Sequence, residues 1–203
     1  MITVYGRNTS TNVQKALWVL AELGLPFERI DKGGPFGGLD DPAYLALNPN
    51  GVIPTMVDGD LVIWESNAIL RHYARTHPEA KLFPTDPLEA LRADMMIDWN
   101  SNEIWNVLRP PFRMVAFDGG KRTDQAVVDG LKATEPYLDR LEMLLGGRTY
   151  VAGPAFTIAD MPLAITMDRW RFMERDFERW PQIDAWHAKC RARPAYKAQV
   201  RDD

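Results

Sequence analysis

The chain has 203 residues, 46% of them hydrophobic, with a formal net charge of −4 and an isoelectric point near 5.4. This acidic balance excludes a general electrostatic attraction to nucleic acid or to anionic lipid. No apolar run reaches the roughly 18 residues that a membrane-spanning helix needs, and the first residues, MITVYGR, lack a signal-peptide pattern. The single cysteine, Cys190, cannot form an intramolecular disulfide. We therefore expect a cytoplasmic protein of one or two domains, with no membrane partner and no nucleic-acid partner.

The first part of the chain alternates between strand and helix patterns. Ile2–Tyr5 and Phe27–Ile30 are predicted to be short strands. Between them, apolar residues recur at helical spacing over residues 12–23, and Gly24 followed by Pro26 predicts the end of that helix. These elements form a β-α-β unit, in which the two strands run parallel.

A β-hairpin is predicted after a short helix at Pro42–Leu47. Two apolar runs rich in β-branched residues, 55–57 and 61–64, are separated by Asp58-Gly59-Asp60, which has the composition of a hairpin turn. Pro54 stands at the start of the first run, where its missing N–H costs no ladder hydrogen bond.

The pair Glu65-Ser66 closes the hairpin and opens the next predicted helix, residues 66–76. Serine at a strand-to-helix junction is a natural N-cap. The free backbone N–H groups at such a helix start also attract a carboxylate. The first domain therefore has the element order β-α-β-α-β-β-α and ends with an anion-attracting turn.

Residues 78–87 contain three prolines and almost no periodicity, so they are predicted to link a first domain, 1–77, to a second domain, 88–203. The second domain shows only helical patterns. Pro110-Pro111 and Asp118-Gly119-Gly120 are expected to break the pattern between its first two helices. The expected helices are residues 88–107, 124–145, 158–175 and 181–193.

Thr157 and Asp160 stand three residues apart and predict a capping box at the start of a helix, with Phe156 and Met161 at the positions of a hydrophobic staple. We interpret this pattern as structural, because a well-built helix start explains it without chemistry.

The segment from Asn48 to Thr55, NPNGVIPT, together with Glu65-Ser66, resembles the glutathione-binding half of cytosolic glutathione transferases. The capping box at Thr157 is similar to one in the second domain of the same family. The resemblance is to the bacterial serine-type branch, theta-, delta- or nu-like. It implies an α/β thioredoxin-like N-terminal domain followed by an all-α C-terminal domain, a detoxifying enzyme with glutathione as co-substrate and no metal, and a homodimer.

The resemblance also implies how glutathione binds. In the family, the proline is cis and the residue before it pairs its backbone with the cysteinyl unit, which assigns these roles to Pro54 and Ile53. Glu65 and Ser66 are expected to hold the γ-glutamyl end. Lys32 is expected to reach the glycyl carboxylate, since no cationic side chain stands near Val52, where many relatives carry one.

The thiol of glutathione needs activation, because at a pKa near ~8.5 only about 3% is thiolate at neutral pH. A hydroxyl or amide donor and the positive end of a helix both stabilise a thiolate. By its similarity to theta- and delta-like transferases, Ser10 is the first choice for the donor. Asn12 is the second choice, because Ser10-Thr11-Asn12 resembles a nu-like loop. Two alternatives stay open: Ser10 only caps the helix, or Tyr5 is the donor, as in alpha-, mu- and pi-like relatives.

The acceptor substrate is expected to meet residues of the second domain. The expected pocket residues are Trp105, Arg109, Phe112 and Arg113. Three functions are compatible with these patterns: a transferase that attacks an electrophilic small molecule, a nu-like glutathione-dependent disulfide reductase, and a non-catalytic transferase-like binding module. The retained residues of the glutathione site and of the loop between the first strand and the first helix, which carries Ser10 and is called the thiol loop, favour the transferase, because a binding module has no need of a thiol site.

Overall fold

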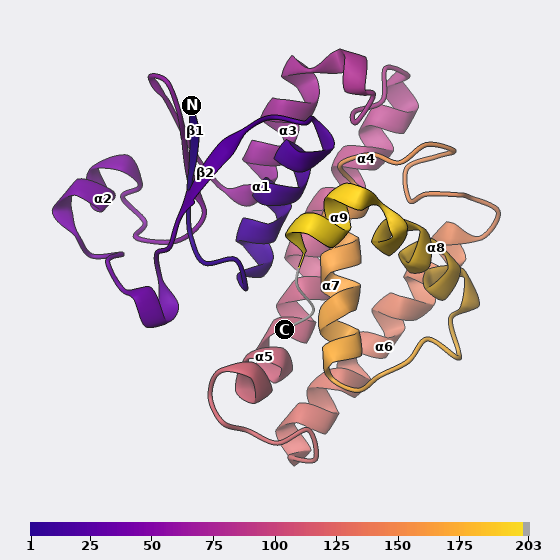
Figure 1. The fold of residues 1–203 in the computed structure, drawn as a ribbon. Helices are drawn as coiled ribbons and strands as arrows, with labels where there is room; N and C mark the ends of the chain where they lie inside the picture. Colours follow the sequence, from indigo (N-terminus) through magenta and orange to yellow (C-terminus); the bar gives the residue numbers. More distant parts are fainter. Residues whose placement is uncertain (201–203) are drawn as a thin grey trace. The chain divides into compact units, whose positions relative to one another are not determined.

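The computed structural model describes residues 1–200 of the chain, which form two compact units (Figure 1). The first unit contains Met1–Phe83 and takes up the chain again from Arg193, and the second contains Pro84–Ala192. The crossing between Phe83 and Pro84 lies inside the predicted linker, 78–87. None of the helices in the described part of the chain is long and apolar enough to cross a membrane.

A mixed four-stranded sheet forms the centre of the first unit, in the order β2-β1-β3-β4. Strands β1 and β2 pair in parallel, as the β-α-β pattern predicts, and β1–β3 and β3–β4 pair antiparallel. Val4 and Met56 are neighbours across β1 and β3 and are both fully buried. The strands are β1 (Ile2–Tyr5), β2 (Phe27–Ile30), β3 (Thr55–Asp58) and β4 (Leu61–Trp64).

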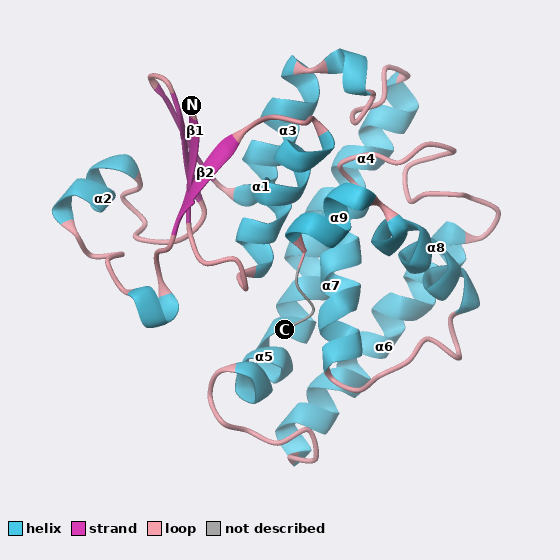
Figure 2. Ribbon diagram, viewed as in Figure 1, coloured by secondary structure: helices cyan, strands magenta, loops and turns pink. Residues whose placement is uncertain are grey.

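Helices of the first unit pack beside this sheet (Figure 2). Helix α1 contacts β1, α3 and α9, and an apolar run including Val13 and Leu17 is buried along it. The ring of Trp18 in α1 meets Tyr196 of α9 edge to face, with 5.0 Å between ring centroids. The helices are α1 (Thr11–Glu22), α2 (Pro42–Leu47), α3 (Ser66–Thr76) and α9 (Pro194–Gln199), with short 3₁₀ turns at Gly34–Phe36 and Pro78–Ala80.

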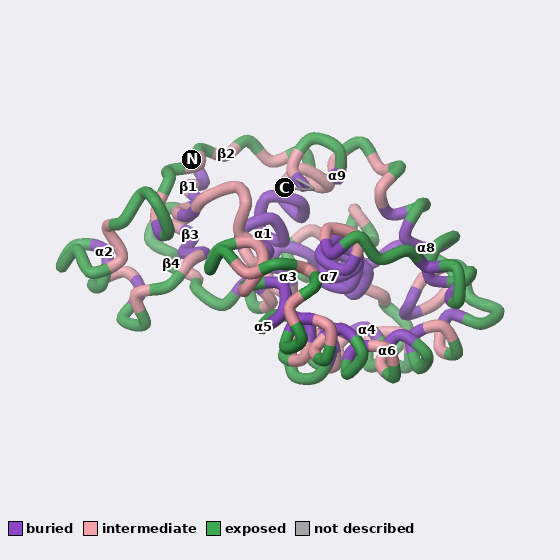
Figure 3. The backbone as a smooth tube through the Cα atoms, turned by 90° about the horizontal axis from the view of Figure 1, so that it is seen from below, coloured by how far each residue is buried: buried purple, intermediate pink, exposed green. Residues whose placement is uncertain are grey.

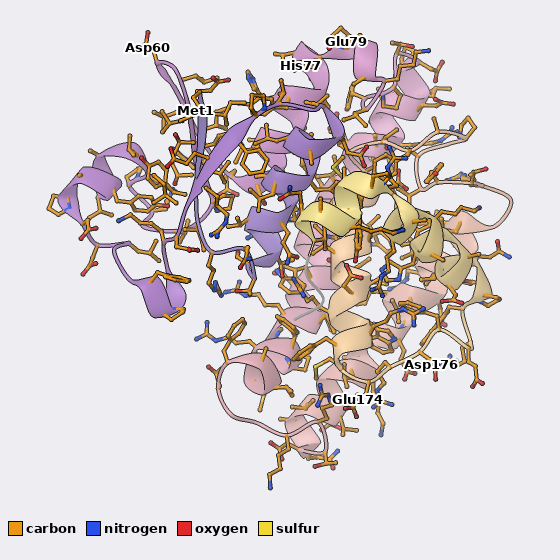
Figure 4. All side chains as sticks on the ribbon, viewed as in Figure 1. Met1, Asp60, His77, Glu79, Glu174 and Asp176 are labelled. Carbon is orange, nitrogen blue, oxygen red and sulfur yellow. The ribbon has the colours of Figure 1, made fainter. Side chains whose placement is uncertain are left out.

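The sheet has two distinct ends. At one end, Met1 lies near Asp60, which is at the tip of the β3–β4 hairpin (Figure 4). In the antiparallel register Tyr5 pairs with Thr55, so the end of β1 and the start of β3 meet at the opposite end. The predicted thiol loop follows β1 there, and the predicted proline precedes β3.

The second unit is entirely helical, as predicted. Helix α7 is buried along most of its length (Figure 3), and its side chains from Asp160 to Trp170 are all buried. The helices are α4 (Pro87–Trp99), a π-helical segment at Asn100–Ile104, α5 (Trp105–Ala116), α6 (Gln125–Leu145), α7 (Asp160–Phe172) and α8 (Pro181–Ala192).

The expected break at Pro110-Pro111 is wrong, because α5 continues through both prolines to Ala116, whereas the one expected at Asp118-Gly119-Gly120 lies between α5 and α6. A proline removes a backbone donor but keeps a helical φ angle, so tertiary packing can hold it inside a helix. Pro111 is buried against α6, where an added Cβ on Gly130 would lie 2.8 Å from Pro111 Cγ. This close approach of α5 and α6 keeps the segment helical.

The predicted capping box is confirmed. Thr157 N donates to Asp160 Oδ2 at 2.9 Å, and Ala159 N donates to Thr157 Oγ1 at 3.3 Å. Asp160 Oδ1 also accepts from Val151 N at 3.0 Å and from Trp186 Nε1 at 2.8 Å. Burial raises the pKa of the Asp160 carboxyl to about 6, while these donors lower it. The box therefore ties α7 to the loop before it and to α8.

Candidate active site

The loop between β1 and α1 begins with a close backbone approach. Gly6 has a φ of +145°, and a Cβ added to it would lie 2.5 Å from Val13 Cγ2 and 3.1 Å from Ile53 Cβ. Gly6 N donates to Ile30 O at 2.8 Å, which fixes the start of the loop to the end of β2. Only glycine fits here, and the thiol loop consequently runs directly beside Ile53.

Ser10 lies at the N-cap position of α1 with extended backbone angles, φ −76° and ψ 122°. Its carbonyl accepts the first helical bond from Gln14 N at 2.9 Å. Its hydroxyl makes no capping hydrogen bond, so the expectation that Ser10 serves only as a side-chain cap finds no support in the geometry. The hydroxyl stands at the positive end of a 12-residue helix.

The Ile53–Pro54 peptide bond is cis, which confirms the prediction. The turn before it is anchored by two buried side chains. Tyr44 Oη donates to Val52 O at 2.7 Å, and Asn48 Nδ2 donates to the same oxygen at 2.9 Å. Asn48 Nδ2 also lies 3.0 Å from Thr55 Oγ1, so both ends of the Ile53–Pro54 segment are held.

Glu65 and Ser66 form the start of α3. Glu65 has a φ of +71°, a conformation that costs a residue with a side chain about 1–3 kcal/mol and that clusters at functional positions. Its side chain is exposed, whereas Ser66 is only 6% exposed. The first turn of α3 presents backbone N–H groups without intrahelical acceptors, which makes it suited to an anion.

A buried polar cluster joins the starts of α1 and α3. Ser66 Oγ lies 3.3 Å from Asn12 Oδ1 and 3.4 Å from Lys15 Nζ. Lys15 Nζ also donates to Asn67 Oδ1 at 3.2 Å. Lys15 is only 3% exposed, and burial lowers its pKa to about 8 while the nearby Glu65 raises it. The second-choice thiol donor, Asn12, is thus bonded to the serine of the predicted γ-glutamyl site.

Both halves of the chain match models of known families. Residues 9–76 match the glutathione S-transferase N-terminal domain, and residues 97–194 match the glutathione S-transferase C-terminal domain. Glutathione S-transferase GstB of Escherichia coli K12 is 32% identical, with 98% of each chain covered. The chain belongs to the glutathione S-transferase family. The resemblance drawn from the sequence is confirmed, and the enzyme conjugates glutathione to electrophiles.

Solved structures of the family superpose closely on this transferase. The theta-class glutathione S-transferase of Xanthomonas axonopodis pv. citri, crystallised with glutathione bound, has a TM-score of 0.90 and 39% identity over 98% of this chain and 96% of that one. A glutathione S-transferase of Pseudomonas fluorescens Pf-5 has a TM-score of 0.87 and 26% identity over 99% and 98% of the two chains. The predicted thioredoxin-like and helical architecture is therefore confirmed.

The rival thiol donor, Tyr5, is engaged in packing. Its ring meets the ring of Tyr44 edge to face, with 5.9 Å between centroids, and its backbone pairs with Thr55 in the sheet. Since Tyr44 itself is hydrogen-bonded to Val52 and Thr55, Tyr5 rests on the residues that anchor the cis peptide.

Lys32 already has partners in the glycine-rich loop of the transferase. Its ammonium forms an ion pair with Asp41 Oδ2 at 2.8 Å and donates to Gly38 O at 3.1 Å. It also lies 5.3 Å from the centroid of the Tyr44 ring. These contacts brace the loop and use two of the three N–H donors of the ammonium, which leaves one donor for a glycyl carboxylate.

The expected acceptor residues fall into two groups in the second unit. Phe112 is buried among aromatic rings, 5.4 Å from Phe172 between centroids, and Arg113 pairs with Asp118 at 3.2 Å. Trp105 is partly exposed and Arg109 is exposed. Arg113 is exposed as well, and the Trp105 ring lies 5.9 Å from the Phe112 ring between centroids, so of the four residues only Phe112 is buried.

Lys15 is the functional candidate that sequence reasoning missed. It stands within a buried stretch of α1 that continues as Ala16–Leu20, and every residue from Val13 to Leu20 is buried. A helix that is apolar on most sides is buried on most sides. A lysine inside such an apolar run is therefore the sequence pattern that predicts a buried cation. Among the residues that the structure describes, no group of three His, Cys, Asp or Glu side chains is placed to hold a metal ion.

Proposed function

We propose that this transferase activates glutathione with the hydroxyl of Ser10, helped by the N-terminus of α1 and by the amide of Asn12. The observation that carries the proposal is the uncommitted hydroxyl of Ser10 at the N-cap of α1. An O–H donor to a thiolate and the positive end of a helix both favour the charged form of sulfur.

The reaction then follows from the stabilised thiolate. The sulfur lone pair attacks an electrophilic carbon of the acceptor, a C–S bond forms, and a leaving group such as halide departs with the bonding electrons. The thiol proton is released to solvent when the thiolate forms. No metal is needed for this step, because the electrophile is already polarised and the nucleophile carries its own charge.

The tripeptide is held by backbone and side chains of the first unit in this proposal. The N–H and C=O of Ile53 pair with the cysteinyl unit as an added strand. Glu65 accepts from the γ-glutamyl ammonium, and Ser66 offers its N–H and hydroxyl to the γ-glutamyl carboxylate. The exposed side chain of Glu65 and its left-handed backbone support this role.

We expect Glu65→Gln to raise the KM for glutathione about tenfold while changing kcat less. The ammonium is bound about equally in the ground and transition states, so losing its partner weakens binding without slowing the chemical step. Steady-state kinetics and calorimetry on the purified variant measure both quantities.

The matched control is Glu28→Gln, which removes the same charge from an exposed position on β2 of the same unit. It should leave KM within twofold of the parent. Glutathione binding as tight in Glu65→Gln as in the parent would move the γ-glutamyl site elsewhere and favour a non-catalytic binding module.

A glutathione-dependent disulfide reductase is the second candidate, and the position of Asn12 favours it. Its amide stands two residues after Ser10 and is bonded to Ser66. In that reaction the thiolate attacks a mixed disulfide of glutathione, forming glutathione disulfide and releasing the other thiol. Parallel assays with an aryl halide and a mixed disulfide separate the two functions: a main role in disulfide reduction predicts that Asn12→Ala lowers the disulfide activity more than the transferase activity.

We propose that Trp105 and Arg109 contact the acceptor, because both are accessible on the second unit. The acceptor is then a small electrophile with an apolar ring or an anionic group. The cytoplasm remains the expected location of the enzyme.

We also propose that the enzyme is a homodimer. The edge strand β4 exposes Leu61, Val62 and Trp64, and α4 exposes Leu88, Leu91 and Met95 on one helical face. Exposed apolar surfaces of this kind mark protein interfaces.

Leu91→Lys should shift the enzyme towards a monomer, because a charge inside an apolar interface is not compensated. Sedimentation velocity at a fixed protein concentration measures the shift. The matched control, Met143→Lys, changes an exposed methionine on α6 in the same unit and should leave the sedimentation coefficient unchanged. A monomeric parent enzyme would contradict the proposal directly.

A further inference from the structure

Lys15 is a buried cation whose contacts in the first unit are both to neutral oxygens, Ser66 Oγ at 3.4 Å and Asn67 Oδ1 at 3.2 Å. Glu65 is the carboxylate that acts on it electrostatically. An ammonium buried without an ion-pair partner is costly, so its retention beside the start of α3 calls for an explanation. A ligand carboxylate at that start supplies the missing countercharge.

The hydrogen-bond chemistry of lysine also fixes the role of Ser66. An ammonium has only donors, so Ser66 Oγ must accept from Lys15. The single hydroxyl hydrogen of Ser66 is then directed away from Lys15, either to Asn12 Oδ1 at 3.3 Å or to a bound carboxylate. A carboxylate accepting from Ser66 at about 2.7 Å would lie within about 6 Å of the Lys15 charge.

We propose that Lys15 is a positioning residue for glutathione: it holds Ser66 as a hydrogen-bond acceptor and provides the positive charge beneath the first turn of α3 that favours the γ-glutamyl carboxylate. This inference rests on the proposed glutathione site and adds a residue to it. Lys15 acts through Ser66 and is not in the thiol-activating group.

The surroundings of Lys15 make its charge dependent on pH. From α3 it faces the neutral Ser66 and Asn67, with Arg71 one turn further along, and Glu65 precedes that helix. Arg193, the residue before α9, pairs with Glu22, which stands at the other end of α1, about 10 Å along the helix axis from Lys15. From β1, the buried Val4 contributes no charge. Since burial lowers the pKa of Lys15 to about 8, the ammonium loses its proton as pH rises through this value.

The test uses S-methylglutathione, which has no thiol, so thiol ionisation cannot contribute. Lys15→Met should weaken its binding about ten- to a hundredfold at pH 7 by calorimetry, and should raise the KM for glutathione more than it lowers kcat. Binding to the parent should weaken further as pH rises from 7 to 9, beyond the change seen in Lys15→Met. The ligand's own amino group contributes equally to both proteins.

Two further variants separate charge from shape. Lys15→Arg keeps the charge and does not titrate in this range, so it should bind within a few-fold of the parent at pH 7 and show no loss up to pH 9 beyond the ligand's own. Lys197→Met removes a lysine from an exposed position on α9 and should bind within twofold of the parent.

The outcomes distinguish this inference from the proposed site. If Glu65→Gln weakens binding while Lys15→Met binds as the parent does, the site stands and the role of Lys15 is refuted. If neither weakens binding, the proposed site itself is wrong. Calorimetry at pH 8 in buffers of different ionisation enthalpy measures the proton directly: binding of S-methylglutathione to the parent should be accompanied by the uptake of a fraction of a proton, more than in Lys15→Met or Lys15→Arg. No uptake would overturn the inference.

Discussion

Ser10→Ala should lower turnover about ten- to a hundredfold while changing glutathione affinity by no more than a few-fold. A hydrogen bond to a charged group contributes roughly 1.5–3 kcal/mol, and each 1.36 kcal/mol is a factor of ten in rate. The hydroxyl makes no capping bond in the structure, so the substitution removes a donor without removing a cap. Turnover measures the effect, together with the apparent pKa of kcat/KM for the acceptor at saturating glutathione, which should rise.

Thr9→Val is the matched control, because it removes a neighbouring hydroxyl from the same loop and keeps the side-chain shape. It should retain turnover within about twofold. Unchanged turnover in Ser10→Ala together with a collapse in Tyr5→Phe would give the role of donor to Tyr5 instead. The edge-to-face contact of the Tyr5 ring with the Tyr44 ring favours Ser10, not Tyr5, as the donor.

Asp160→Asn should lower the free energy of unfolding by about 3–5 kcal/mol. The carboxylate is fully buried and accepts from the backbone of Val151 and Thr157 and from the indole of Trp186, at 2.8–3.0 Å. An amide turns one acceptor into a donor and leaves a buried N–H facing another N–H, which costs several kcal/mol. Urea denaturation followed by tryptophan fluorescence measures the change.

Asp129→Asn provides the comparison for this result. Asp129 lies exposed on α6 and accepts from Gln125 at 2.8 Å, so its replacement should change the free energy of unfolding by less than about 0.5 kcal/mol. A loss below about 1 kcal/mol in Asp160→Asn would show that the capping box contributes little and that α7 is held by apolar packing alone.

The local elements of the first unit were predictable because their signals are local. The helix start at Ser66, the hairpin turn at Asp58-Gly59-Asp60 and the parallel pairing of β1 with β2 all follow from short patterns and turn chemistry. The cis peptide at Ile53–Pro54 was predictable only through the family resemblance, since nothing in the physics of the surrounding residues selects the cis form.

The errors lie where distant contacts decide. Helix α5 passes through Pro110-Pro111 because Gly130, on another helix, leaves room for Pro111. Helix α9 was not predicted, and the chain from Arg193 groups with the first unit although the sequence assigned it to the second domain. Tyr196 meets Trp18 and Arg193 meets Glu22, which lie 178 and 171 positions earlier, and no local pattern indicates these contacts.

The polar cluster at the site was hidden for the same reason. Lys15 meets Ser66 and Asn67, which lie 51 and 52 positions later in the chain. The sequence identified Asn12 and Ser66 separately, as members of two motifs, and the structure joins them through a contact of 3.3 Å. Lys32 and Arg113 were predicted from the sequence to contact a ligand, and the structure shows that each forms an ion pair, with Asp41 and with Asp118.

A crystal structure of the enzyme with bound glutathione tests the proposed roles of Ser10, Ile53 and Ser66 together. We expect the sulfur to lie within hydrogen-bond distance of Ser10 Oγ, the cysteinyl backbone to pair with Ile53, and the γ-glutamyl carboxylate to meet the N–H and hydroxyl of Ser66 near Lys15. A sulfur directed at the hydroxyl of Tyr5, or a γ-glutamyl carboxylate bound away from the start of α3, would contradict it.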